Sequence, residues 1–306
     1  MNNMGWKITV PASTANLGPG FDSIGLALNR YLTLYVSHHH LWEVAALSPS
    51  LEDFPKDERN FIVRIAIETC TAFGVDLAPC SIQVKSDIPL ARGLGSSAAA
   101  IVAGIELADV VGNLGLSQKS KLELATHYEG HSDNVGASLY GGLVVSCETD
   151  EGIELLPIDE LPICVVTVSP EEELKTEKAR EVLPERLSFS EAVKAGGVSN
   201  VLIAALLKQD WQLAGKMMKG DRYHQPYRKP LLPHYELVER IAERNGAFGV
   251  ALSGAGSTIA CFAEETKAEW LYRQMYQSFP DMSVQIISID NKGMTTETMY
   301  FQGELS

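Results

Sequence analysis

The sequence predicts an α+β protein with two domains, and three observations lead to that expectation. Strand and helix patterns alternate through the first half, the second half follows a strand–helix–strand–strand–helix–strand order, and a turn-rich acidic stretch, Glu148–Glu160, separates them. A chain of 306 residues is long for one domain and comfortable for two, each able to bury its own core. We therefore expect one domain over residues 1–155 and another over residues 156–306.

Apolar periodicity predicts the elements of the first half. Alternating or continuous apolar runs indicate strands at Trp6–Val10, Arg30–Val36, Ser81–Lys85 and Gly142–Cys147. Apolar residues at helical spacing indicate helices over residues 60–74, 98–109 and 117–130. Asn60 is a favourable N-cap for the first of these helices, and Gly74 and Gly130 are suited to end the first and third.

The second half combines four strands with two main helices. The strands are expected at Ile163–Val168, Ala247–Leu252, Thr258–Phe262 and Val284–Ile289. The helices are expected at Ser190–Lys208, interrupted at Gly196-Gly197, and at Glu264–Phe279, with extra helices at 211–218 and 233–245. This order is the split ferredoxin-like pattern. The polar stretch Asn291–Ser306 is expected to be disordered.

Composition and charge exclude several classes of protein. A formal net charge of −14 argues against a nucleic-acid surface, which needs clustered lysine and arginine. No apolar run reaches the about 18–20 residues of a membrane span, and the first residues lack the pattern of a signal peptide. Five scattered cysteines suggest neither disulfides nor a zinc site. We therefore expect a cytoplasmic protein that binds neither membrane nor nucleic acid.

A glycine- and serine-rich loop at residues 88–100, IPLARGLGSSAAA, runs directly into an alanine-rich helix. Gly93 and Gly95 can adopt backbone angles that turn N–H groups toward a ligand. Ser96 and Ser97 supply hydroxyls, and the helix presents free N–H groups and the positive end of its dipole. These features favour a site for an anion such as a nucleotide phosphate. The loop lacks the lysine of a Walker A motif, so a plain serine-capped turn is the alternative.

Two further segments are rich in small residues. The first, residues 11–28, contains Asn16 and Asp22, the two polar side chains suited to grip a small polar substrate. The second, residues 249–258, bends between two strands at Gly254 and Gly256. Either segment alone is also compatible with an ordinary irregular hairpin.

Together the three segments resemble the signature motifs of the GHMP kinases, in that family's order: PASTANLGPGFDSIGLAL, IPLARGLGSSAAA and GVALSGAGSTI. The similarity extends through EGHSDN at 129–134 and QPYR at 225–228. It implies an N-terminal domain like the second domain of ribosomal protein S5 and a ferredoxin-like C-terminal domain. It also implies phosphorylation of the side-chain hydroxyl of L-homoserine by ATP, a step towards threonine, and it is compatible with a homodimer.

The resemblance places ATP along the loop, with the triphosphate at the helix N-terminus. The candidate nucleotide contacts are Pro89, Leu90, Ala91, Arg92, Gly93, Leu94, Gly95, Ser96 and Ser97. Ser97 and Glu129 match the family's metal-contacting positions, and Mg²⁺ prefers such oxygen ligands. Without the motif, Glu129 would be interpreted as a surface glutamate.

Homoserine is a zwitterion, so its pocket needs an anion for the ammonium and a cation for the carboxylate. Asp22 or Asp133 suits the ammonium, and the planar fork of an arginine suits the carboxylate. Arg180 and Arg228 resemble the family's substrate-binding positions. Thr176 is a candidate neighbour of the reacting hydroxyl. Asn16 and His131 are further substrate-binding candidates.

The catalytic base is left open between two assignments. Some family members use an aspartate to accept the hydroxyl proton, and either Asp133 or Asn134 matches that position. If Asn134 occupies it, we favour direct transfer assisted by the γ-phosphate, with Asp133 holding the ammonium. Two other functions remain as alternatives: another small-molecule kinase of the mevalonate type, and a non-catalytic regulator that binds ATP and a metabolite.

Overall fold

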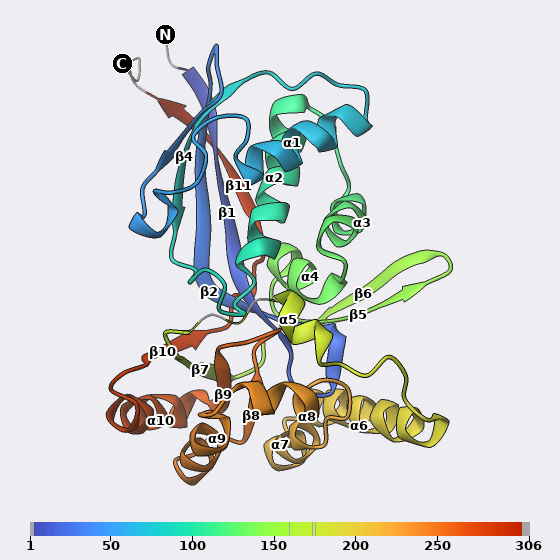
Figure 1. Ribbon diagram of the computed structural model, residues 1–306. Coiled ribbons are helices and arrows are strands. Elements are labelled where there is room, and N and C mark those ends of the chain that lie inside the picture. The colour runs from blue at the N-terminus through green and yellow to red at the C-terminus, as the bar shows by residue number, and fades with distance from the viewer. Residues whose placement is uncertain (1–2, 159, 173, 175, 302–306) are drawn as a thin grey trace.

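The computed structural model describes residues 3–158, 160–172, 174 and 176–301, and it consists of two sheet-and-helix units (Figure 1). The first unit has a seven-stranded sheet with the main order β11-β1-β2-β4-β3, to which β5 and β6 are added through β2. Its strands are β1 (Asn3–Asn16), β2 (Gly20–His38), β3 (Glu43–Ala46), β4 (Cys80–Ser86), β5 (Leu143–Thr149), β6 (Gly152–Ile158) and β11 (Thr295–Phe301).

One face of this sheet is covered by α1 (Phe61–Ala72), α2 (Ser96–Gly112), α3 (Gln118–Glu129) and α4 (Ser132–Tyr140) (Figure 1). Helix α2 is buried along most of its length, from Ala98 to Ala108. A helix that is apolar all round has to lie inside the fold, and small alanine side chains let its neighbours approach closely. This burial fixes the N-terminus of α2 at the end of the sheet that lies nearer the second unit (Figure 1).

The hairpin of β1 and β2 carries the first motif at its turn. The pairing shifts register between Pro11 and Ala12, and again between Ala15 and Asn16. Such irregularities bend a strand and redirect its side chains, and they are frequent beside active sites. At this end of the hairpin Asn16 contacts the second unit, since its Nδ2 donates to the Gly254 carbonyl oxygen.

The second unit is a four-stranded antiparallel sheet with the order β10-β7-β9-β8. These strands are β7 (Ile163–Ser169), β8 (Gly249–Leu252), β9 (Ile259–Glu264) and β10 (Ser283–Ser288). Helices cover its outer face (Figure 1), and they are α6 (Phe189–Leu207), α7 (Trp211–Lys219), α9 (Tyr235–Arg244) and α10 (Glu265–Ser278). The fourth strand lies beside the first and the third beside the second, so the ferredoxin-like order is confirmed. Short helices, α5 (Thr176–Glu181) and α8 (Gln225–Arg228), lead to the boundary between the units.

The turn-rich acidic stretch Glu148–Glu160, which the sequence suggested as the boundary between the domains, is largely regular in the structure. Most of that stretch forms the β5–β6 hairpin, in which Thr149 pairs with Gly152. Acidic and turn-forming residues there lie on an exposed hairpin, where charge is compatible with a strand.

The stretch Asn291–Ser306 is not disordered throughout. Residues 295–301 form β11, which pairs antiparallel with β1, from Thr9 opposite Thr295 to Asn3 opposite Phe301; residues 302–306 lie outside the described part. Because its backbone forms hydrogen bonds with β1, this polar segment becomes a strand at the edge of the sheet. The boundary expected between residues 155 and 156 would cut through β6 and would assign β11 to the second domain. We propose instead that both strands belong to the first domain, because they pair with its sheet.

The expected interruption at Gly196-Gly197 is also wrong, because α6 runs without a break from Phe189 to Leu207. A glycine inside a helix costs about 1 kcal/mol relative to alanine, which weakens a helix without ending it. The N-terminal capping box of Ser188 and Glu191 supports α6 against that cost.

Candidate active site

The loop between β4 and α2 is shaped by two glycines with positive φ angles, +72° at Gly93 and +71° at Gly95. Gly95 is the N-cap of α2, which begins at Ser96, two residues earlier than the sequence predicts. The backbone N–H groups of Ser96, Ser97 and Ala98 are therefore in the first helical turn, where they have no partner within the helix. These groups and the helix dipole create a site for an anion.

The three sequence motifs meet at this loop. A Cβ atom at Gly93 would lie 2.2 Å from the carbonyl oxygen of Ser253, and one at Gly95 would lie 2.2 Å from Oγ of Ser13. The Ser253 hydroxyl lies between the Gly93 carbonyl oxygen (2.6 Å) and Thr14 Oγ1 (2.8 Å). Glycine is required at both positions because the backbones of the other two motifs approach so closely.

Replacing Gly95 by alanine is therefore expected to destabilise the protein more than the same change at Gly74. Gly74 has the same φ of +71°, but no described atom lies within 4 Å of its Cβ position. Gly74→Ala should cost only the backbone strain, about 1 kcal/mol. Gly95→Ala adds the clash with Ser13 and should cost at least about 2 kcal/mol of unfolding free energy. Urea denaturation measures both; equal losses would contradict this account of Gly95.

Ser97 and Glu129 come together beside the loop. The Ser97 hydroxyl donates a hydrogen bond to Glu129 Oε2 at 2.9 Å. Glu129 ends α3, and burial raises the pKa of its carboxyl, although His131 and the Ser97 hydroxyl act in the opposite direction. A hydroxyl and a carboxylate next to a phosphate-binding loop are the hard oxygen ligands that suit Mg²⁺.

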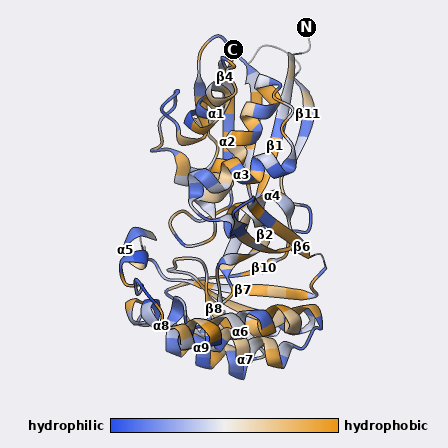
Figure 2. Ribbon diagram, turned by 90° about the vertical axis from the view of Figure 1, so that its right-hand side faces the viewer, coloured by the Kyte–Doolittle hydropathy of each residue, from blue (hydrophilic) through white to orange (hydrophobic). Residues whose placement is uncertain are grey.

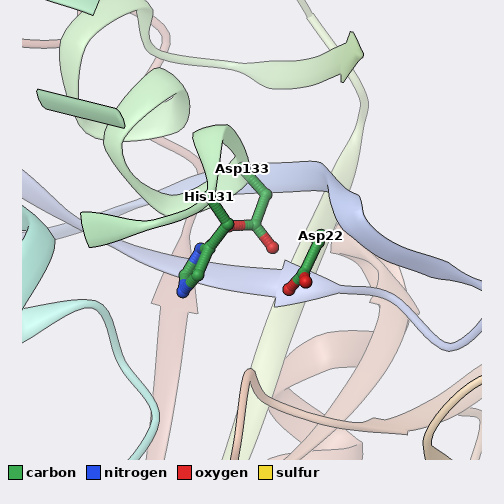
Figure 3. A group of neighbouring side chains, drawn as sticks. All are labelled: Asp22, His131 and Asp133. Carbon is green, nitrogen blue, oxygen red and sulfur yellow. The ribbon is translucent and has the colours of Figure 1, made fainter. Parts of the chain in front are cut away.

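Asp22, His131 and Asp133 form an acidic group at the other side of the site, with their polar atoms within 4.8 Å of one another (Figure 3). Asp133 is buried, and its Oδ1 accepts hydrogen bonds from Nδ1 of His131 at 2.5 Å and from the N–H of Asn134 at 2.7 Å. Burial lowers the pKa of His131, but the hydrogen bond and charge of Asp133 outweigh it, so the pKa is raised. The group concentrates negative charge on one side of the site.

The side chain of Asn134 does not join this group but forms a hydrogen bond with Ser13. Its Nδ2 donates to Ser13 Oγ at 2.9 Å, and Ser13 Oγ in turn donates to the Asn134 carbonyl oxygen at 3.2 Å. These bonds join α4 to β1 in the buried region behind the loop. Helix α4 was not predicted from the sequence, and it is the element that presents Asp133 and Asn134 in different directions.

Two arginines supply the positive charge. Arg180 donates to both carboxylate oxygens of Asp22, at 3.1 and 3.2 Å. Arg228 is buried; its Nε donates to the Ala179 carbonyl oxygen at 2.9 Å and its Nη1 to the Gly254 carbonyl oxygen at 3.1 Å. Burial, and then the charge of Arg180, lower the pKa of Arg228 to about 10, so it stays protonated at neutral pH. No hydrogen bond from its Nη2 is found among the described residues.

Phe21 and His224 belong to the site, although sequence reasoning did not identify them. The Phe21 ring stacks on His224 with a centroid distance of 5.3 Å, and the guanidinium carbons of Arg180 and Arg228 lie 5.7 and 5.2 Å from its centre. The only sequence signals are their positions beside Asp22 and the QPYR motif.

His224 is neutral and holds Arg228 in place. Burial, and then the charge of Arg228, lower the pKa of His224 to about 3. Its Nε2 lies 3.0 Å from the Gly18 carbonyl oxygen, to which it donates, so Nδ1 is the acceptor for Arg228 Nη1 at 3.3 Å. The first motif and Arg228 are thus joined through this imidazole.

Most of the sequence-predicted site residues line one cavity of about 140 Å³. The residues that share it are Asn16, Asp22, Ala91, Arg92, Gly93, Leu94, Gly95, Ser96, Ser97, Glu129, His131, Asp133, Asn134, Arg180 and Arg228. Asn16 shapes the first motif, since its Oδ1 accepts from the Asp22 N–H and its Nδ2 donates to the Gly254 carbonyl. Thr176 begins α5, but its side chain lies outside the described part of the chain.

Two of the predicted nucleotide contacts, Pro89 and Leu90, are not among the residues that line this cavity, and Arg92 also borders another one. Leu90 lines a second, largely apolar cavity of about 250 Å³, which Ser96 and Ser97 also border. Pro89 lines a separate surface groove together with Arg92. Arg92 donates through Nη1 to the carbonyl oxygens of Pro170 and Glu172, so its charge is directed partly toward a neighbouring loop.

Family models match both units of the structure. The model described as GHMP kinases N terminal domain matches residues 60–142, and the model described as GHMP kinases C terminal matches residues 202–281. Both models describe kinases, and the two units that they match flank the charged cavity. The chain belongs to the GHMP kinases.

The relatives narrow this class. Homoserine kinase of Bacillus licheniformis is 48% identical over 295 residues, 96% of each chain. That of Shouchella clausii is 50% identical over 285 residues, 93% of this chain and 95% of that one. The crystal structure of homoserine kinase from Cytophaga hutchinsonii has a TM-score of 0.83 at 26% identity, covering 97% of this chain and 98% of that one. A mevalonate kinase shares the fold, with a TM-score of 0.70 at 16% identity and coverage of 94% and 99%. Within the GHMP kinases the chain groups with homoserine kinases, and it is an ATP-dependent kinase.

Proposed function

We propose that this chain transfers the γ-phosphoryl group of ATP to the side-chain hydroxyl of L-homoserine, giving O-phospho-L-homoserine for threonine biosynthesis in the cytoplasm. The observation that carries the proposal is the lining of the cavity beside the glycine- and serine-rich loop, which combines the carboxylates of Asp22 and Asp133 with the guanidinium groups of Arg180 and Arg228. An amino acid with a free hydroxyl complements both charges. The similarity to homoserine kinases along nearly the whole chain supports the same substrate.

The ion pair of Arg180 and Asp22 suggests how the zwitterion binds. The substrate ammonium would approach Asp22 and Asp133, and its carboxylate would approach Arg180 and the unengaged Nη2 of Arg228. One internal ion pair is then exchanged for two charge-assisted contacts with the substrate. Binding at this position orients the side-chain hydroxyl within the same cavity as the phosphate loop, which is the positioning that phosphoryl transfer requires.

The nucleotide would occupy the two cavities that share Ser96 and Ser97. Its phosphates would accept hydrogen bonds from the backbone N–H groups at the start of α2. The apolar cavity, with Leu32, Val44 and Ile62 among its lining residues, is suited to the base. Ser97 and Glu129 would hold Mg²⁺, which neutralises phosphate charge when bound.

Asp133 is proposed to bind the ammonium rather than to act as the base. Its Oδ1 already accepts two hydrogen bonds, and Asn134 is engaged with Ser13 and has no basic group. The hydroxyl proton would then pass to the transferred phosphoryl group. Asp133→Asn should therefore raise the homoserine Kd at least about tenfold while kcat at saturating substrate changes less. A large loss of kcat with unchanged affinity would instead assign Asp133 as the base.

Coupled measurement of ADP release tests the substrate. L-Homoserine should stimulate ADP release strongly, whereas 4-hydroxybutyrate, which lacks the ammonium, and mevalonate should not. Stimulation by mevalonate would favour a mevalonate-type kinase. Binding of ATP and homoserine without ADP release would favour a regulatory protein.

A further inference from the structure

Phe21 is a half-buried aromatic residue among the residues that line the charged cavity. Its backbone is fixed by the turn of the first motif, where Gly20 pairs with Asn16 and the N–H of Asp22 donates to Asn16 Oδ1 at 3.0 Å. A side chain carried by such a constrained turn keeps its position relative to its neighbours. The ring of Phe21 is therefore a fixed surface within the site.

Three side chains that would bind or support the substrate carboxylate gather around this ring. The guanidinium carbons of Arg180 and Arg228 lie 5.7 and 5.2 Å from its centre, both within the range of a cation–π interaction. The imidazole of His224 stacks on the ring at a centroid distance of 5.3 Å, with 23° between the two planes. Because His224 is neutral, these aromatic groups bring two guanidinium groups together without adding positive charge.

Two positive groups in one small site need compensation. Burial, and then the charge of Arg180, lower the pKa of Arg228, so the two guanidinium groups repel each other. Asp22 acts in the opposite direction, and it accepts two hydrogen bonds from Arg180. The negative face of an aromatic ring attracts cations as well. Phe21 and Asp22, which are adjacent in the sequence, therefore both reduce this repulsion.

The side chain of Arg180 has few other contacts that fix it. It belongs to α5, a helix of six residues that Figure 2 shows as mainly hydrophilic, and its side chain is 41% exposed. Within the described part of the chain, its hydrogen bonds go to Asp22 alone. In the proposed complex Asp22 turns to the substrate ammonium. The ring of Phe21 would then be the contact that keeps Arg180 near Arg228.

We propose that Phe21 is a positioning residue whose ring holds Arg180 and Arg228 together as one receptor for the carboxylate of the substrate. The inference rests on the proposed function, because that function assigns the carboxylate of homoserine to these two arginines. Side chains that are held in place before binding lose less rotamer freedom when the substrate arrives. Phe21 is then also a determinant of specificity, since only a substrate with a carboxylate gains from the arranged arginines.

A simple apolar contact with the substrate is the alternative role for Phe21. In that case the ring would pack against the methylene groups of homoserine, and its loss would weaken every substrate with the same carbon chain. Homoserinol separates the two roles. It keeps the ammonium, the carbon chain and the reacting hydroxyl, but it has a second hydroxyl in place of the carboxylate.

Steady-state kinetics of Phe21→Leu with both substrates test the proposal. Leucine keeps an apolar side chain and removes the ring. The KM for L-homoserine should rise at least about tenfold, equivalent to about 1.4 kcal/mol, while kcat changes by less than about threefold. Both constants for homoserinol should change by less than about threefold. Phe21→Tyr keeps the ring and should stay within about threefold of the wild-type chain with both substrates.

Phe73→Leu is the matched control. Phe73 is 50% exposed at the end of α1 and is not among the described residues that line the cavity, so its replacement should leave all constants unchanged. Calorimetric affinity for ATP shows whether the rest of the site is intact in each variant. Phe21→Met also removes the ring, and it takes the place of Phe21→Leu if the leucine variant does not fold.

Three results would overturn the role of Phe21. They are unchanged homoserine kinetics in Phe21→Leu, equal losses with homoserine and homoserinol, and a loss in Phe21→Tyr as large as that in Phe21→Leu. Equal losses with the two substrates would assign the ring to a simple apolar contact. A wild-type chain that releases no ADP with L-homoserine would instead overturn the proposed function, and the carboxylate receptor with it.

Discussion

Replacing Glu129 by glutamine is expected to lower kcat for homoserine phosphorylation by about a hundredfold or more. Glutamine keeps the size of the side chain and can still accept the hydrogen bond from Ser97, which is 2.9 Å from Oε2 in the wild-type protein. What it removes is the negative charge that would bind Mg²⁺ next to the phosphate loop. Steady-state rates measured over a range of Mg²⁺ concentrations should show weaker apparent Mg²⁺ affinity as well as a lower maximum.

Glu123→Gln on the same helix is the matched control for this prediction. Glu123 is exposed on α3 and lies outside the cavity, so its replacement should leave the rate and the Mg²⁺ dependence unchanged. Near-wild-type activity of the Glu129 variant would show that Glu129 does not hold the metal. Ser97 would then be the remaining candidate ligand for Mg²⁺.

Replacing Arg228 by lysine should lower kcat/KM for homoserine by about a hundredfold, equivalent to about 2.7 kcal/mol. The positive charge is kept, but a single ammonium cannot replace the fork that contacts the Ala179 and Gly254 carbonyl oxygens and His224. The Nη2 group, which donates no hydrogen bond within the described part of the chain, is lost, and with it the proposed donor for the substrate carboxylate. The effect should appear mainly in the homoserine KM.

Two further measurements separate binding from folding for this variant. Lysine leaves buried acceptors without donors, so Arg228→Lys should also lower the free energy of unfolding by about 1–3 kcal/mol. Affinity for ATP, measured by calorimetry, should nevertheless be nearly unchanged because the hydrogen bonds of Arg228 go to Ala179, His224 and Gly254 and not to the glycine- and serine-rich loop. Arg240→Lys, on the exposed surface of α9, should change neither quantity. An equal loss of ATP affinity in Arg228→Lys would indicate a general distortion of the site.

Local sequence patterns were sufficient for much of the fold. Helices α1, α2 and α3 were predicted because their apolar residues recur at helical spacing or because caps such as Asn60 and Gly130 mark their ends. The β7–β10 order followed from strand and helix alternation. In contrast, α4 has polar residues such as Ser132, Asp133 and Asn134 in fully buried positions, so it has no amphipathic pattern to detect.

Contacts between distant parts of the chain explain two other differences between the predicted and the observed secondary structure. β11 is a polar strand that becomes regular only because β1, nearly three hundred residues earlier, provides its hydrogen-bond partners. α6 persists through Gly196 and Gly197 because a good cap and packing against α7 exceed the cost of two glycines. Neither fact is a property of the local sequence.

For the candidate site, the sequence by itself determined the chemistry that is present. Glycine and serine spacing predicted a phosphate-binding loop, and the charged residues near the motifs were recognised as candidates for binding substrate and metal. Only the tertiary structure decided which groups face each other. Arg180 reaches Asp22 across 158 positions of sequence, Asn134 turns to Ser13, and Phe21 and His224 join the two arginines. The physical reason is that these contacts depend on how two separately formed sheets pack together, and that packing is set by the whole buried surface rather than by the neighbours of any one residue.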